Sequence, residues 1–293
     1  MTRLLLLALL AAACGSDDGP VDGMAAGDLA AVDGAVGDLA MVDAALPPVR
    51  FVFQFDYRYD TQGFFADPAR RSCLEETAKL WGRLITSDFP TVPAGTELKV
   101  RDPEHPSDPA VDLVAPADID NILVFVGSAA IDGPQGALAQ SNHTGGVSTI
   151  SNPTLQAALY DRYHGSPFQP WVAWISFDPA EAWTFDADPA TSEAVPAGKL
   201  DFVSVALHEL AHVLGQGTSD IWDSQVSAQT FTGTKATQVF GAPVPLTADG
   251  VHVAPGTMSM GETILAVSAK THDRRYLPTA VDRALLEDLG YTF

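Results

Sequence analysis

One short stretch of the sequence combines residue types that can bind a metal ion and activate water. Residues 202–213 are apolar except for Ser204, His208, Glu209 and His212. In a helix, His208 and His212 lie one turn apart on the same face, where two imidazoles can share one zinc ion. Glu209 can then act as general base toward the attacking water. The pattern predicts a catalytic zinc site; the alternative is two surface histidines on an amphipathic helix.

The neighbouring residues delimit this helix but do not complete the metal site. Asp201 can cap its first turn and Gly215 can end it. A catalytic zinc takes three protein ligands and keeps one position for water. Thr218 stands where a compact His-x-x-Gly-x-x-His motif would have its third histidine, and threonine is a poor zinc ligand. The third ligand must therefore come from elsewhere in the chain.

His252 is the leading candidate for that third ligand. It lies in a turn-rich loop, residues 249–256, which has no apolar periodicity that would require a core histidine. An exposed loop histidine without a ligand role is the alternative. Other candidates for the third ligand are Asp220, Asp223, His272 and Glu262.

Three segments together resemble the metzincin zinc endopeptidases. They are residues 208–215, the separate His252 and the C-terminal residues 274–291, and they are closest to bacterial leishmanolysin-like members, in which an insertion precedes the third histidine. Residues 175–178, running into Trp183, are similar to the last sheet strand and acidic turn of matrixin-like catalytic domains. The resemblance covers residues 49–293, and its specific part is the His-Glu-x-x-His-x-x-Gly core.

The resemblance implies an α+β catalytic domain with a twisted mixed sheet, two long helices, a zinc cleft and a C-terminal helix. It implies one catalytic Zn²⁺ on His208, His212 and His252. It also implies a substrate that adds as an extra strand to an edge strand, here residues 136–140 with Ala137, Leu138 and Ala139. A methionine in a tight turn beneath the zinc is expected, for which Met258 is the candidate. Calcium is a weaker expectation, at the acidic residues Asp178, Asp186 and Asp188.

Local patterns predict several elements without the resemblance. Residues 51–57 alternate apolar and polar side chains as a half-buried strand does, and residues 122–126 are an apolar run typical of a central strand. Asp67 followed by proline predicts the start of a long helix. Thr279 and Asp282 form a capping box before a C-terminal helix. Further strands are expected at residues 96–101, 136–140 and 171–177.

Composition excludes one class of partner. The chain of 293 residues has 37 acidic and 16 basic side chains, a formal net charge of −21. A surface of this charge cannot neutralise phosphates, so no nucleic-acid partner is expected. The two cysteines cannot form a disulfide framework, and Cys73 is expected as a small buried apolar residue in the first long helix. A monomer is expected.

The N-terminus resembles a bacterial lipoprotein signal. An apolar run at residues 4–13 ends in small residues just before Cys14, and it is far too short to span a bilayer. Residues 1–13 are therefore expected to be a signal peptide, Cys14 the lipidated N-terminus and residues 14–48 an acidic Ala/Gly/Asp-rich tether. Gly15 after the cysteine implies an outer-membrane or cell-surface address, with the lipid as the only membrane contact. The alternative is a plain secretory signal and a secreted protein.

Three functions fit these patterns. The first is an endopeptidase that hydrolyses peptide or protein substrates by zinc and Glu209. The second is a non-catalytic surface binding or adhesion module that keeps a degenerate metzincin frame. The third is a zinc hydrolase of another amide, such as a cell-wall peptide. Glu209 argues against the second function, and nothing in the sequence separates the first from the third.

Acylation of Cys14 predicts that the protein fractionates with membranes and partitions into detergent, because a lipid anchor holds it there. Cys14→Ser should block maturation or release a soluble form, measured by Triton X-114 partitioning and immunoblot. A wild-type protein found wholly in the culture supernatant, with a free N-terminus at or after residue 14, would contradict lipidation.

Overall fold

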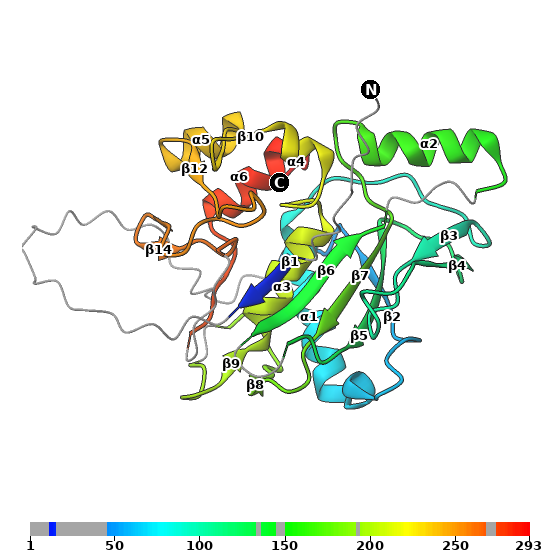
Figure 1. The fold of residues 1–293 in the computed structure, drawn as a ribbon, viewed down its shortest axis with the longest axis horizontal. Coiled ribbons are helices and arrows are strands. Elements are labelled where there is room, and N and C mark those ends of the chain that lie inside the picture. Colours follow the sequence, from blue (N-terminus) through cyan, green and yellow to red (C-terminus); the bar gives the residue numbers. More distant parts are fainter. Residues whose placement is uncertain (1–11, 16–45, 133–135, 145–149, 192–193, 268–273) are drawn as a thin grey trace, which may run out of the picture.

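A five-stranded mixed sheet forms the centre of the computed structural model (Figure 1). The model describes residues 12–15 (backbone only), 46–132, 136–144, 150–191, 194–267 and 274–293. The strand order is β1 (Ala12–Gly15), β6 (Ala137–His143), β7 (Val172–Phe177), β5 (Ile122–Ser128) and β2 (Phe53–Asp56). Strands β2, β5 and β7 are parallel, whereas β6 is antiparallel to both β7 and β1. The expected α+β class with a mixed sheet is confirmed.

The central strand β5 is buried on both faces, as its unbroken apolar run predicts. Ile122, Val124 and Val126 belong to the core that includes the long helices. Leu123 and Phe125 alternate with them and belong to a second core on the opposite face. Since successive strand side chains point to opposite faces, only a strand covered on both sides can be apolar throughout.

Two helices cover one face of the sheet: α1 (Pro68–Leu84) and α3 (Phe202–Val213) (Figure 1). The Asp67 side chain accepts a hydrogen bond from the backbone N–H of Ala69, which caps α1 as predicted. Helix α1 packs on α3, and the fully buried Trp81 donates its Nε1–H to the Leu207 carbonyl at 3.0 Å. This contact ties the longest helix to the helix that carries the histidines.

The other helices and strands lie outside this central sheet and the two helices that cover it. They are η1 (Phe64–Ala66), β3 (Glu97–Val100), β4 (Val111–Val114), α2 (Pro153–His164), β8 (Trp183–Thr184), β9 (Leu200–Asp201), α4 (Asp220–Ser224), β10 (Val226–Ser227), β11 (Thr230–Phe231), α5 (Thr234–Phe240), β12 (Val244–Pro245), β13 (Met258–Ser259), β14 (Glu262–Thr263) and α6 (Ala280–Asp288). The strand expected at residues 96–101 is present as β3, but it pairs with β4 in a separate two-stranded sheet. Helix α2 is not predicted by the sequence patterns, and α6 begins with the expected capping box. None of the helices described is both long and apolar enough to cross a membrane.

A buried ion-pair network fixes the start of α3. Arg275 contacts Asp186 at 2.7 Å and Asp201 at 2.9 Å, and these three side chains are 9%, 8% and 1% exposed. Asp201 also caps α3 by accepting the backbone N–H of Ser204 at 3.1 Å. Arg275 therefore joins the segment before α6 to the N-terminus of α3.

Arg275→Met should lower the free energy of unfolding by about 3–5 kcal/mol, because it leaves two buried carboxylates without their counter-charge. Arg274→Met is the matched control. Its side chain is exposed, and the change should cost less than about 1 kcal/mol. Urea unfolding followed by tryptophan fluorescence measures both, and equal losses in the two variants would contradict this role of Arg275.

Candidate metal centre

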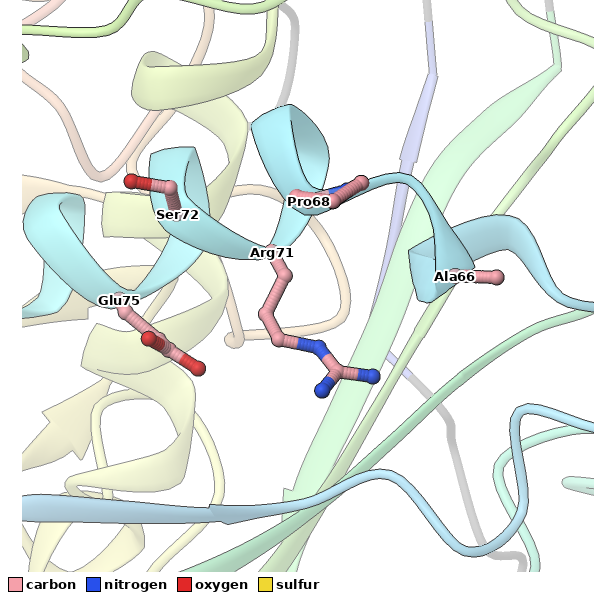
Figure 2. Close-up of a pocket in the computed structure, with 5 residues that line it drawn as sticks. All are labelled: Ala66, Pro68, Arg71, Ser72 and Glu75. Carbon is pink, nitrogen blue, oxygen red and sulfur yellow. The ribbon is translucent and has the colours of Figure 1, made fainter.

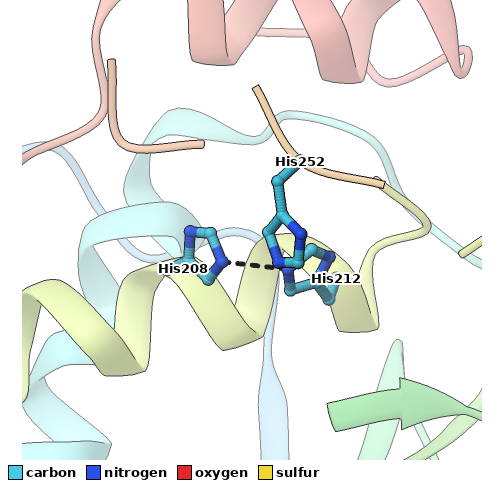
Figure 3. Close-up of side chains that lie close together, drawn as sticks. All are labelled: His208, His212 and His252. Atoms are coloured by element: carbon cyan, nitrogen blue, oxygen red, sulfur yellow. Dashed lines mark hydrogen bonds between the residues drawn. The ribbon is translucent and has the colours of Figure 1, made fainter. Parts of the chain in front are cut away.

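Three histidines from two separate segments converge in the interior (Figure 3). His208 and His212 project from one face of α3, and His252 reaches them from the loop between β12 and β13. Their side chains are buried, and one ligand nitrogen from each lies within 4.8 Å of the other two. Among the residues that the model describes, this is the one group of three or more histidine, cysteine or acidic side chains placed to share a metal ion.

Backbone carbonyls orient the two helical imidazoles. His208 Nδ1 lies 2.9 Å from the carbonyl oxygen of Leu265, and His212 Nδ1 lies 2.7 Å from that of Gln216. A carbonyl oxygen only accepts hydrogen bonds, so each Nδ1 carries the proton. Each Nε2 therefore presents a lone pair toward the centre of the group, which is the tautomer that a metal ligand needs.

The donor set fits zinc. The Nε2 atoms of His208 and His212 lie 2.9 Å apart, a distance at which two lone pairs repel unless a cation or proton lies between them. Zinc bound tetrahedrally at about 2.0–2.1 Å from each nitrogen separates two such atoms by about 3.3 Å. A movement of roughly a few tenths of an ångström would bring the nitrogens of His208 and His212 to that separation. His252, whose ligand nitrogen lies within 4.8 Å of both, is placed to be the third ligand.

The loop that carries His252 is held by its own hydrogen bonds. Thr247 N–H donates to the His252 carbonyl at 2.9 Å, and Val253 N–H donates to the Ala266 carbonyl at 3.0 Å. Val251 N–H donates to Asp249 at 3.0 Å. These bonds on both sides of His252 fix its backbone, so its imidazole is presented to α3 by a rigid turn rather than by a helix.

The other candidate ligands lie elsewhere. The Asp220 side chain is 72% exposed and pairs with His164 at 2.8 Å. Asp223 and Glu262 are exposed, and His272 lies outside the described residues. The structure therefore brings His252, and none of the described alternatives, to the pair on α3.

Thr218, which replaces the third histidine of a His-x-x-Gly-x-x-His motif, hydrogen-bonds to the C-terminal end of α3. Its hydroxyl donates to the His212 carbonyl at 2.7 Å, and its own carbonyl lies 2.9 Å from His143 Nε2. Gly215, which precedes it, has a φ of +101°, and a Cβ there would lie 2.6 Å from the Phe168 ring. Glycine is thus required for the turn that ends the helix.

Glu209 is fully buried beside the histidines and is held by a residue of the sheet. Ser141 on β6 donates its hydroxyl toward Glu209 Oε2 at 2.7 Å and lies 3.0 Å from the Glu209 carbonyl oxygen. The sequence patterns do not predict this contact. The sequence feature that could have indicated it is a polar residue, Ser141, on the strand face that packs against α3.

A buried turn lies behind His208, but it contains no methionine. Residues 264–267 are all at most 2% exposed, and the Leu265 carbonyl faces His208. Asp282 accepts the backbone N–H groups of Leu265 and Ala266 at 3.0 and 2.9 Å. The candidate Met258 is 50% exposed on β13, so it does not lie in this buried turn.

The strand proposed to bind substrate is present but has a neighbour. Strand β6 includes Ala137, Leu138 and Ala139 and packs against α3. Its outer side pairs antiparallel with β1, in the register Ala12↔Ser141 and Gly15↔Ala137. In the described structure β6 therefore lies between β1 and β7 rather than at the edge of the sheet. Residues 12–13 of β1 belong to the expected signal peptide, so the expectation that β6 binds substrate stays a prediction.

The three acidic side chains considered for calcium have other partners. Asp178 accepts backbone N–H groups from Ile131 and Ala180, and Asp188 accepts one from Ala190. Asp186 pairs with Arg275. The structure does not bring the three together as a metal-binding group among the described residues.

Two other features are distinct from the histidines. A pocket of about 200 Å³ lies along the first turns of α1, lined by Ala66, Pro68, Arg71, Ser72 and Glu75 (Figure 2). None of these residues belongs to the group of histidines. Cys73 is fully buried as expected, and burial raises the pKa of its thiol to about 11, which disfavours the reactive thiolate.

No protein-family model matches the sequence, and no curated protein matches it significantly. The inference of function therefore depends on the geometry of the histidines and Glu209.

The purified domain should bind about one zinc ion per chain, and His252→Ala should lose most of it because two imidazoles alone make an incomplete site. His164→Ala is the matched control, since that histidine is a surface residue paired with Asp220. Elemental analysis after dialysis measures the zinc. Full zinc retention in His252→Ala would contradict the role of His252, and combined with loss in Asp220→Ala it would assign the ligand to Asp220.

Proposed function

We propose that the protein is a zinc-dependent endopeptidase of the metzincin type. The observation that carries this proposal is the convergence of three buried histidines, two with Nε2 directed inward by backbone carbonyls, beside a buried glutamate. Three histidines and one position for water are the ligand set of a catalytic zinc rather than a structural one. A structural site would be closed by a fourth protein ligand, and none joins this group among the described residues.

The residues divide the reaction between them. Zinc, when bound, supplies Lewis acidity toward the peptide carbonyl and toward water. Glu209 removes a proton as the water oxygen attacks the carbonyl carbon, and it then delivers that proton to the amine nitrogen as the C–N bond breaks. The products are a carboxylic acid and an amine, and a proton transfer through water converts them to a carboxylate and an ammonium group. His208, His212 and His252 hold the ion, and they stay neutral while they do so.

Strand β6 is the element suited to align a peptide. It packs on α3, and one of its residues contacts Glu209, so a chain added to its outer side lies close to the base. Residues 12–15 already pair there in an extended conformation. This supports an edge whose backbone groups accept an antiparallel segment, and main-chain pairing of that kind binds peptides with little dependence on side chains.

The proposed enzyme works at the bacterial surface. Acylation of Cys14 would hold it at the outer membrane, and the tether of residues 14–48, with residues 14–15 released from β6, would let the domain range about 30 Å from the bilayer. The substrates are then peptides or proteins near that surface. The strongly negative chain would not itself bind anionic lipid, so the lipid is the only anchor.

Glu209→Gln should lower the hydrolysis of casein by about a hundredfold or more while zinc stays bound, because the amide keeps the shape and cannot take a proton. Glu262→Gln is the matched control at an exposed glutamate, and it should retain wild-type activity. Fluorescein-casein release and elemental analysis measure the two properties.

Two outcomes would lead to other conclusions. Equal activity in Glu209→Gln and the wild type would contradict the role of Glu209 as base. No activity in either protein, with zinc bound to both, would favour a non-catalytic surface binding module.

A further inference from the structure

Ser141 is a buried hydroxyl at the contact between the sheet and the helix that carries the histidines. Its side chain is fully buried, and it lies opposite Ile175 of β7 on one side and Ala12 of β1 on the other. Its Oγ lies 2.7 Å from Glu209 Oε2. Alternate positions of the strand face the same way, and His143, two residues on, contacts the carbonyl of Thr218 just after α3.

The hydroxyl is well suited to fix a carboxylate. A serine has one proton to donate, and the shorter of its two contacts is to the carboxylate rather than to the Glu209 carbonyl oxygen at 3.0 Å. A hydrogen bond to an ionised acceptor is about twice as strong as one between neutral groups. It therefore selects one rotamer of Glu209, and it does so from the strand that we assign to the substrate.

We propose that Ser141 is a positioning residue for Glu209, an inference that rests on the proposed function. Its hydroxyl holds one carboxylate oxygen so that the base meets the water at a fixed distance. Because the same residue belongs to β6, it also sets the base relative to a peptide paired on that strand. Misplacing a catalytic group by about 1 Å can cost about a hundredfold in rate.

Ser176 provides a matched control for the structural role of a buried serine. It lies on the neighbouring strand β7, is fully buried, and its hydroxyl has no hydrogen-bond partner among the described residues. Ser176→Ala therefore makes the same chemical change in the same sheet without touching Glu209. If the Ser141 hydroxyl only filled space in the sheet, the two variants would behave alike.

The first test separates kcat from KM on a fluorogenic peptide. Ser141→Ala should lower kcat by about tenfold to a hundredfold, with KM within about twofold of wild type and zinc content unchanged. Ser141→Thr keeps the hydroxyl, and it should recover a large part of kcat. In the Glu209→Gln background, Ser141→Ala should have no further effect on the residual rate, because its role acts through the carboxylate.

The second test does not require turnover. Acetohydroxamate binding to the zinc-loaded protein, measured by calorimetry, should weaken by about threefold to tenfold in Ser141→Ala and not in Ser176→Ala. The difference should vanish in the Glu209→Gln background. This result in a protein that hydrolyses no peptide would retain Ser141 as a positioning residue and reject the endopeptidase.

The inference fails under equally clear conditions. Hydrolysis by the wild type, together with matching kcat and hydroxamate affinity in Ser141→Ala and Ser176→Ala, would reject it and retain the enzyme. Additive losses in the Glu209→Gln background would also reject it, because the serine would then act independently of the carboxylate. Absence of zinc binding in the wild type would overturn both proposals.

Discussion

Burying four ionisable side chains on one helix is the constraint on which much of this structure depends. His208, Glu209, His212 and the cap Asp201 are at most 2% exposed. A buried polar group without a partner costs about 1–3 kcal/mol, and more if it is charged, so each of these side chains needs a hydrogen-bond or ion-pair partner. The contacts come from elements on several sides of the helix. The surroundings of α3 are thus determined by its polar atoms as much as by its apolar ones.

The contact to His208 continues into the C-terminal helix. Asp282 closes the capping box of α6 through Thr279, and it also accepts the backbone N–H groups of Leu265 and Ala266. Those bonds hold the turn whose carbonyl faces His208. Burial raises the pKa of Asp282, and its hydrogen bonds to backbone and hydroxyl donors oppose that shift. A cap residue of one helix therefore helps to orient a side chain of another.

The start of α3 is held by a second polar chain. Ser204 donates its hydroxyl to Asp201 at 2.6 Å and accepts the backbone N–H of Tyr276 at the same distance. Arg275, next to that tyrosine, pairs with Asp201 as well. Ser204, the polar residue of α3 for which no role in catalysis is expected, thus binds the C-terminal segment to the helix. Both ends of the helix and the segment leading to α6 are fixed by buried hydrogen bonds, which suits a site that must hold its geometry.

The sequence by itself determined the elements whose signals are local. Asp67, Asp201 and the pair Thr279–Asp282 marked three helix starts correctly, and the apolar run in β5 indicated a strand covered on both faces, because caps and periodicity extend over only a few residues. Helix α2 was missed although Asn152 caps it, since its buried side chains are few and include Arg162.

The sequence also determined the helical part of the site, because His208 and His212 are one turn apart on any helix. Only the tertiary structure decided which residues complete that site. His252 rather than Asp220, Ser141 on Glu209, and the Leu265 carbonyl on His208 join residues 40 or more positions apart in the chain. No local pattern encodes such contacts. They follow from how strands and loops pack around α3. They are favoured because a buried polar atom without a hydrogen-bond partner raises the free energy of the folded state.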